Sequence, residues 1–232
     1  MLTNIKAAIF DVDGTLVNSM GIWKEIDIDY LAKFGLELPD SLQYEIEGMS
    51  FKETAIYMKE KFKIPDSVEQ IMEDWNNMAF DKYTNEVELK SGARELLHFL
   101  KKQGVKLGVA TSNSGKLAGA VLTRHGIKDY FDCIITASEV DKGKPAPDVY
   151  LEAAKRLQIL PEECLVFEDI VPGIAAGIAA GMKVCAVEDD YSKCQKEAKM
   201  ELADYFIESF KEIEGIEIID TDIFKEKGRK CL

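Results

Sequence analysis

The chain has 232 residues, of which 47% are hydrophobic, and a formal net charge of −13 at pH 7. This length and composition are typical of a soluble globular protein with one large domain or a core plus an insert, and the excess of acidic residues argues against nucleic acid polymers as partners. No apolar run is long enough to span a membrane and the start lacks the pattern of a secretory signal, so we expect a cytoplasmic protein with no membrane partner.

The cysteines and histidines do not form the pattern of a structural metal site. There are five cysteines, none of them in a CxxC pair, and only two histidines, His98 and His125. Zinc sites usually combine such residues at short spacing, so we expect no zinc site. Three of the cysteines lie in apolar strand-like runs, where buried thiols are expected.

The first predicted element is a buried strand at residues 5–10. Two aspartates, Asp11 and Asp13, follow it directly in the sequence FDVDGTL. Neighbouring carboxylates repel each other, and their desolvation is costly. A strand that ends on two carboxylates therefore indicates that other groups compensate their charge.

Residues 18–86 are predicted to be helical almost throughout. Apolar residues at helical spacing begin near Trp23, and Gly35 ends that run. Pro39 and Pro65 separate the segments that follow. The further helices are expected at residues 42–47, 52–62 and 67–83.

After Gly92 the chain alternates between helix-like and strand-like runs. Helices are expected at residues 93–102, 116–124, 147–157 and 174–180, and strands at residues 105–110, 133–136, 164–167, 183–187 and 204–207. This alternation is the signature of a doubly wound parallel sheet. We therefore predict an α/β fold with a Rossmann-like sheet, in which residues 1–17 and 87–232 form the core and residues 18–86 an inserted helical cap. The last residues, 225–232, are predicted to form a solvated tail.

Polar side chains follow several of the predicted strands. They are Asp11 and Asp13 after the first strand, Thr111, Ser112 and Asn113 after the second, Lys144 in the loop after the third, and Glu168 and Asp169 after the fourth. Each group alone could be a turn or a helix cap. Ligands of such sheets bind at the carboxyl ends of the strands, so these groups together predict a binding site at one edge.

Four segments, DVDGTL, ATSN, KPAPD and FEDIVPG, resemble the four ordered motifs of the haloacid dehalogenase-like (HAD) superfamily. The pattern is most similar to the branch of phosphatases and β-phosphoglucomutase-like enzymes, in which a helical cap follows the first motif. The resemblance extends over residues 5–187, and the four motifs in this order are highly specific as a set. It implies an enzyme of phosphoryl transfer.

The resemblance also implies a role for each acid. Asp11 would be the nucleophile that attacks phosphorus and becomes an aspartyl phosphate, and Asp13 would act first as general acid and then as general base. Mg²⁺ would be bound by the side chains of Asp11 and Asp169 and by the backbone carbonyl of Asp13, with Glu168 helping directly or through water. The cation and a lysine would then compensate the paired carboxylates.

The remaining motif residues would bind the phosphoryl group or orient the acids. The phosphate-binding set implied by the resemblance is the Thr111 hydroxyl, the Ser112 amide, Asn113 and Lys144. Thr15 would hydrogen-bond to Asp13 and fix its direction.

Two positions depart from the pattern of the β-phosphoglucomutases. Those enzymes carry a basic residue after a Gly-x-Ser turn in the cap, where this chain has Phe51 after Gly48-Met49-Ser50, and a histidine where this chain places Trp23. Both differences favour hydrolysis over mutase chemistry. The two aromatic residues either form a wall over the substrate or belong to the cap core, and the sequence leaves both alternatives open.

The sequence thus predicts a Mg²⁺-dependent phosphatase of a small phosphorylated metabolite, with a sugar phosphate or a nucleotide-like ester as substrate. A phosphomutase of the β-phosphoglucomutase type is the first alternative, and a non-catalytic phosphate-binding regulatory protein on this fold is the second. We expect a monomer whose cap closes over the substrate about hinges at residues 17–19 and 86–90.

Overall fold

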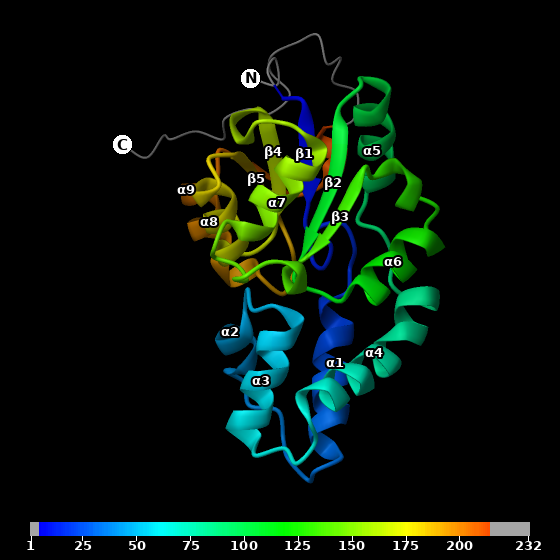
Figure 1. The fold of residues 1–232 in the computed structure, drawn as a ribbon, viewed down its shortest axis with the longest axis vertical. Coiled ribbons are helices and arrows are strands. Elements are labelled where there is room, and N and C mark those ends of the chain that lie inside the picture. Colours follow the sequence, from blue (N-terminus) through cyan, green and yellow to red (C-terminus); the bar gives the residue numbers. More distant parts are fainter. Residues whose placement is uncertain (1–4, 214–232) are drawn as a thin grey trace.

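The structure, a computed structural model, describes residues 5–213, and these contain a six-stranded sheet in which all strands are parallel (Figure 1). The strands are β1 (Ala7–Phe10), β2 (Lys106–Thr111), β3 (Cys133–Thr136), β4 (Cys164–Glu168), β5 (Lys183–Val187) and β6 (Tyr205–Ile207). Their order is β3-β2-β1-β4-β5-β6, so the strand order reverses at β1. The predicted α/β fold with a Rossmann-like sheet is confirmed, and its topological switch point lies where β1 ends.

Helices cover both faces of the sheet, because β1 is apolar on both sides. Ala8 and Phe10 belong to the core of one face, and Ala7 and Ile9 to the core of the other. Helices α5 (Ala93–Lys102) and α6 (Gly115–Arg124) cover the first face, and α7 (Asp148–Leu157) and α8 (Val171–Ala179) cover the second. Helix α9 (Lys196–Leu202) contacts the edge strand β6.

Four helices between β1 and α5 form a separate block at the carboxyl ends of the strands (Figure 1). They are α1 (Met20–Ala32), α2 (Leu42–Ile46), α3 (Phe51–Phe62) and α4 (Val68–Asn85). Serine caps fix two of their starts: Ser50 and Glu53 form a capping box at α3, and the Ser67 hydroxyl accepts the Gln70 N–H at 3.1 Å at α4. The block therefore begins its helices close to where the sequence predicts them.

Two backbone segments that lie side by side connect this block to the sheet. Val17 forms an isolated antiparallel bridge with Leu89, and the Asn18 N–H donates to the Glu88 carbonyl at 2.9 Å. The Lys90 ammonium donates to the Asp189 carboxylate at 2.7 Å and so anchors the second segment to the loop after β5. The division at residues 17 and 87, with hinges in these segments, is compatible with this geometry and remains a prediction.

The differences from the sequence prediction lie in short elements. Helix α9, with seven residues, and the three-residue turns of 3₁₀ helix, such as Phe210–Glu212, are too short to show a clear apolar period. The predicted tail at 225–232 lies outside the described residues. The other predicted strands and helices of the core are present, with ends displaced by at most about three residues.

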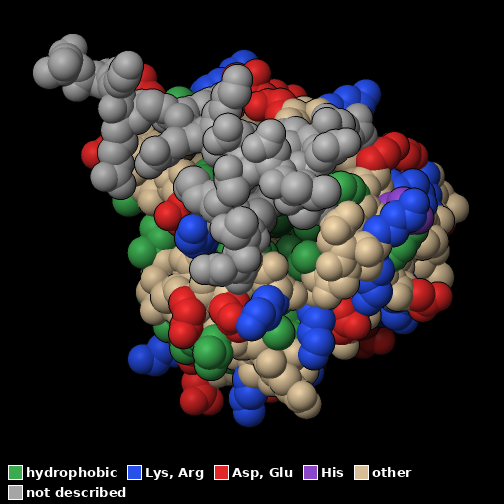
Figure 2. All heavy atoms as spheres, turned by 90° about the horizontal axis from the view of Figure 1, so that it is seen from above, with side chains coloured by type: hydrophobic (Ala, Val, Ile, Leu, Met, Phe, Trp, Pro, Cys, Tyr) green, Lys and Arg blue, Asp and Glu red, His purple; other side chains and the backbone are tan. Residues whose placement is uncertain are grey.

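One face of the core is mixed in charge where its side chains are visible (Figure 2). On the face turned away from the helical block, Lys and Arg side chains are interspersed with Asp and Glu (Figure 2). Within residues 5–213, no helix has the length and apolar character that crossing a membrane requires.

Three phenylalanines hold the late 3₁₀ turn against the sheet. Phe10 stacks on Phe167 with ring centroids 4.6 Å apart, and Phe210 meets Phe167 edge-on at 5.7 Å. Phe210 is fully buried, so removal of its ring would leave a cavity at the centre of this face.

Replacing Phe210 with alanine should therefore lower the free energy of unfolding by about 3–5 kcal/mol. Urea denaturation of both proteins measures this difference. Leu160, which is 59% exposed, supplies the control, because Leu160→Ala should change stability by no more than about 0.5 kcal/mol. Similar losses in the two variants would contradict the packing described here.

Candidate active site

The carboxyl ends of the central strands bring the predicted site residues together. Phe10 pairs with Val109 of β2 and with Phe167 of β4, so the residues that follow these strands lie next to one another. A cleft of ≈ 360 Å³ lies between this edge and the helical block. Its lining includes seven of the predicted residues from the core: Asp11, Asp13, Thr111, Ser112, Asn113, Lys144 and Asp169.

Lys144 is the positive centre of this edge. Its buried ammonium donates to Asp11 Oδ1 at 2.7 Å and to Glu168 Oε1, and the Tyr150 hydroxyl donates to the same Glu168 oxygen at 2.6 Å. Lys144 comes from the loop between β3 and α7, whereas Asp11 directly follows β1 and Glu168 is the last residue of β4. One ammonium group thus joins three segments of the chain.

The site holds more negative than positive charge. Burial raises the pKa of Asp11 to about 8; Lys144 acts in the opposite direction, and Glu168 and Asp13 act in the same direction as burial. Burial, Glu168 and Asp11 likewise raise the pKa of Asp169 well above its usual value. Burial opposes the charge of Lys144, but Asp11 and Glu168 outweigh it and raise the pKa of the ammonium.

Three of these carboxylates can share a cation. Asp11, Glu168 and Asp169 are buried and each offers an oxygen within 4.8 Å of the others. Carboxylate oxygens are the ligands that Mg²⁺ prefers, and a divalent cation would offset the burial and the repulsion that raise the pKa of Asp11 and Asp169. Gly14, at φ 85°, leaves room for this group, because a Cβ atom there would collide with the Asp169 carboxylate. The residues present therefore fit a bound Mg²⁺.

Asp13 is held by three hydrogen-bond donors. Ser19 donates to its Oδ1 at 2.5 Å, Asn113 Nδ2 donates to its Oδ2 at 2.8 Å, and the Tyr83 hydroxyl donates to Oδ1. The Tyr83 hydroxyl in turn accepts from Trp23 Nε1 at 2.7 Å and from Asn113 Nδ2 at 3.0 Å. Two of these residues, Tyr83 and Trp23, belong to helices of the cap.

The prediction for Thr15 was wrong. Its hydroxyl donates to Asp169 Oδ1 at 2.9 Å rather than to Asp13, and the residue is fully buried rather than part of the cleft lining. The turn after β1 points the hydroxyl toward β4 and not back along the chain. Thr15 thus orients a candidate metal ligand and does not line the cleft.

The segment after β2 offers two hydroxyls to the cleft. Thr111 Oγ1 accepts the Asn113 N–H at 3.0 Å, whereas Ser112 Oγ is buried and has no hydrogen-bond partner among the described residues. An unpaired buried hydroxyl at a binding edge suits a polar ligand. The Ser112 carbonyl accepts the N–H of Phe51 at 2.9 Å, which ties the start of α3 to this segment.

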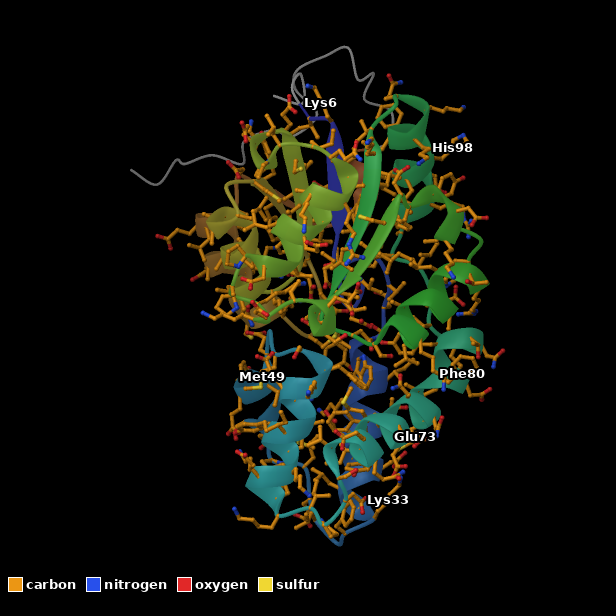
Figure 3. All side chains as sticks on the ribbon, in the orientation of Figure 1. Lys6, Lys33, Met49, Glu73, Phe80 and His98 are labelled. Atoms are coloured by element: carbon orange, nitrogen blue, oxygen red, sulfur yellow. The ribbon has the colours of Figure 1, made fainter. Side chains whose placement is uncertain are left out.

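Trp23 and Phe51 lie in the cleft wall and in the cap core at once. Both line the cleft, yet Phe51 is only 8% exposed and packs edge-on against Trp75 at 5.6 Å and Trp23 at 5.9 Å. The neighbouring Met49 lies at the end of the cap that meets the core (Figure 3). The two alternatives left open by the sequence are therefore compatible with each other.

Sequence reasoning missed Ser19 and Tyr83. Tyr83 lies 70 positions from Asp13 in the chain, and nothing in the local pattern of α4 separates it from the other core residues of that helix. Ser19 immediately precedes α1, where a serine is expected as a helix cap, but its hydroxyl binds Asp13 instead.

A known protein family matches most of the chain. The family model described as haloacid dehalogenase-like hydrolase matches residues 8–187. This range contains the strand ends from Asp11 to Asp169 that form the edge of the cleft.

Two curated relatives illustrate the activities on this sequence pattern. Hexitol phosphatase B of Escherichia coli (strain K12) is 30% identical over 221 residues, which are 93% of this chain and 97% of that protein. The bifunctional riboflavin kinase/FMN phosphatase of Arabidopsis thaliana is 37% identical over 180 residues, which are 77% of this chain. The match covers 47% of that relative, so this chain spans about half of its length.

Solved structures show the same architecture. CbbY from Rhodobacter sphaeroides, in complex with phosphate, is 25% identical with a TM-score of 0.82, over 90% of this chain and 96% of that one. The fold is also shared with β-phosphoglucomutase from Clostridium difficile, at 24% identity and a TM-score of 0.77, over 91% and 94% of the two chains.

Binding of Mg²⁺ to the three carboxylates should raise the thermal midpoint of unfolding. At a concentration about 100 times its dissociation constant, the ion would stabilise the folded state by about 2.7 kcal/mol. Differential scanning calorimetry with excess Mg²⁺ or excess chelator measures this shift. Asp169→Asn should lose most of it, because one ligand charge is removed.

The matched control is Asp141→Asn, which removes an exposed carboxylate that is not part of this group and should keep the shift. If Asp169→Asn responds to Mg²⁺ as strongly as the wild type does, the cation site is not where we place it.

Proposed function

The chain belongs to the haloacid dehalogenase-like hydrolase family and is a phosphatase of that type, and we propose that it hydrolyses a small phosphomonoester through an aspartyl phosphate on Asp11, with Mg²⁺ as cofactor. The observation that carries this proposal is the arrangement around Asp11. Its carboxylate is paired with Lys144 at 2.7 Å and lies beside a group of acids that fits a divalent cation, and Asp13 follows two residues later, held by three donors.

In the first half of the reaction, an Asp11 oxygen attacks phosphorus and the bond from phosphorus to the ester oxygen breaks. Asp13 gives its proton to the departing alkoxide, which leaves as the alcohol. In the second half, Asp13 takes a proton from a water molecule, whose oxygen attacks the phosphorus of the aspartyl phosphate. Inorganic phosphate leaves and Asp11 is regenerated.

The residues around Asp11 prepare it for this attack. Lys144 donates to one Asp11 oxygen and holds it in place, and it neutralises part of the charge that the phosphoryl group adds. Mg²⁺, held by Asp11, Asp169 and the Asp13 carbonyl with Glu168 nearby, would neutralise the remainder and orient the phosphoryl oxygens. Ser112, with its unpaired hydroxyl and its backbone amide, is available to those oxygens.

The charge of the cleft favours a monoester over a bisphosphate. Among the described residues that line it, the cations are Lys24 and Lys144, and Lys144 is already paired with two acids. The cap side contributes the acids Asp27, Asp40 and Glu47. A second phosphate would meet more negative than positive charge there, which argues for hydrolysis rather than for a phosphomutase reaction.

The size and relatives of the chain suit a small metabolite. A cleft of ≈ 360 Å³ holds a leaving group of the size of a sugar or a nucleoside. Hexitol phosphatase B matches nearly its whole length to this chain, and this supports a sugar or polyol phosphate over a larger ester. We retain a nucleotide-like ester as the second substrate class, because the cleft wall also contains Trp23 and Phe51.

Asp11→Asn should lower the kcat for p-nitrophenyl phosphate at least about a hundredfold, because an amide does not attack phosphorus. Borohydride reduction of the wild type during turnover should convert Asp11 to homoserine, which mass spectrometry locates in the chain. Asp141→Asn serves as the control and should keep full activity. The nucleophile assignment fails if Asp11→Asn turns over normally or if the label is found at another residue.

Tyr83→Phe should lower kcat about ten- to a hundredfold for alkyl phosphates and less for p-nitrophenyl phosphate. The variant removes one donor to Asp13, worth about 1.5–3 kcal/mol for a charged partner, and a poor leaving group depends more on the acid than a good one does. Measuring kcat and KM of the variant and of the wild type, each on an alkyl phosphate and on p-nitrophenyl phosphate, tests this effect.

Tyr57→Phe is the matched control, since the Tyr57 hydroxyl contacts Glu45 within the cap and not Asp13. Equal losses on both esters, or a loss in KM alone, would contradict a role of Tyr83 in orienting the acid.

A further inference from the structure

A buried acid of the cap lies in the cleft without a charged partner. Asp27 of α1 is 5% exposed and lines the cleft. Gln43 of α2 donates from Nε2 to Asp27 Oδ2 at 2.9 Å, and among the described residues it is the only hydrogen-bond partner that Asp27 has. Asp27 Oδ1 thus remains available to a group in the cleft.

The position of Asp27 follows from the period of α1. It comes four residues after Trp23, so the two side chains lie on the same face of the helix, one turn apart. Both line the cleft, with Leu38 and Ile46 beside them. Helix α1 therefore presents the Trp23 ring and the Asp27 carboxyl group to the cleft. Along the chain, Trp23 is the nearer of the two to Asp13.

Burial is unfavourable for this acid as it stands. Desolvation raises the pKa of Asp27 to about 7, although the Gln43 donor acts in the opposite direction. A leucine at this position would fill the wall without that cost. An acid that is buried, lacks a cation and faces the substrate cleft is a candidate for substrate recognition.

We propose that Asp27 and Gln43 bind adjacent hydroxyl groups of the leaving group, so that the substrate is a polyhydroxylated monophosphate, a sugar or polyol phosphate. This inference rests on the proposed function. The carboxyl and amide groups, 2.9 Å apart, offer acceptors and donors side by side, as two neighbouring hydroxyls require. The apolar wall around them covers the carbon chain.

The same pair discriminates against other leaving groups. An anionic group would be repelled by Asp27, and an apolar chain would leave Asp27 Oδ1 desolvated and without a hydrogen-bond donor. A hydroxylated neutral group satisfies both. Selectivity would then come from the cap, whereas the phosphoryl chemistry stays with the residues at the strand ends.

The test compares a hexitol monophosphate with hexyl phosphate, which has the same number of carbon atoms and no hydroxyls. The wild type should show a higher kcat/KM for the hexitol ester. Asp27→Leu should lower kcat/KM for the hexitol ester about ten- to a hundredfold and leave hexyl phosphate unchanged or improved, because the loss is confined to hydroxyl contacts. Gln43→Leu should shift the ratio in the same direction.

Asp29→Leu is the matched control, since Asp29 lies on the same helix but is exposed and outside the cleft. Asp27→Asn keeps the size of the side chain and supplies a second variant, expected to lose part of the preference, if Asp27→Leu does not fold. Turnover of hexyl phosphate by each variant reports on folding and on the chemistry at Asp11.

The assignment of Asp27 would be overturned if the ratio of kcat/KM for the hexitol ester to that for hexyl phosphate stayed at the wild-type value in both Asp27 variants, or if both esters lost activity equally. Phosphate release by the wild type would in that case leave the proposed function intact. No phosphate release from either ester by the wild type would overturn the proposed function and this inference with it.

Discussion

The contact of Lys144 with Asp11 and Glu168 makes the remainder of the site possible. Four carboxylates meet at the carboxyl edge of β1 and β4, and burial raises the pKa of two of them, Asp11 and Asp169. Lys144 forms ion pairs with two of them, Asp11 and Glu168, and Tyr150 supplies a further donor to Glu168. The backbone is shaped for the same purpose: a side chain at Gly173, in the first turn of α8, would occupy the place of the Glu168 carboxylate.

This constraint explains why so much of the site was visible in the sequence. A parallel sheet with its switch point at β1 places the residues after β1, β2, β3 and β4 at one edge, so short motifs far apart in the chain could be combined before any contact was known. Asp11, Ser112, Lys144 and Asp169 were all found in this way. Their roles in chemistry follow from the family pattern, and the geometry is compatible with them.

The contacts that sequence reasoning missed depend on tertiary packing or on the course of the turn after β1. Tyr83 reaches Asp13 because α4 returns to the core after 70 residues, and its spacing on the helix is that of an ordinary core residue. Thr15 could have reached either Asp13 or Asp169, and only the course of the turn after β1 decides that it binds Asp169. The sequence does contain a sign of Asp27, because an acid four residues after Trp23 falls on the apolar face of α1. The composition of the helix alone does not reveal it.

Asp13 is the residue of the core that connects the candidate active site with the cap. Its carboxylate lies in the core, yet Ser19 belongs to the connecting segment and Tyr83 to the cap. Trp23 lies in the cleft wall and donates to the same Tyr83 hydroxyl. A leaving group that packs against the Trp23 ring would therefore contact a residue that is hydrogen-bonded, through Tyr83, to Asp13. If the cap were displaced, Tyr83 and Trp23 would move with it and Asp13 would keep only the donors of the core and the linker. In the mechanism we propose, Asp13 is therefore fully oriented as the proton donor only when the cap covers the cleft. The same arrangement would shield the proposed aspartyl phosphate from bulk water until the alcohol has left.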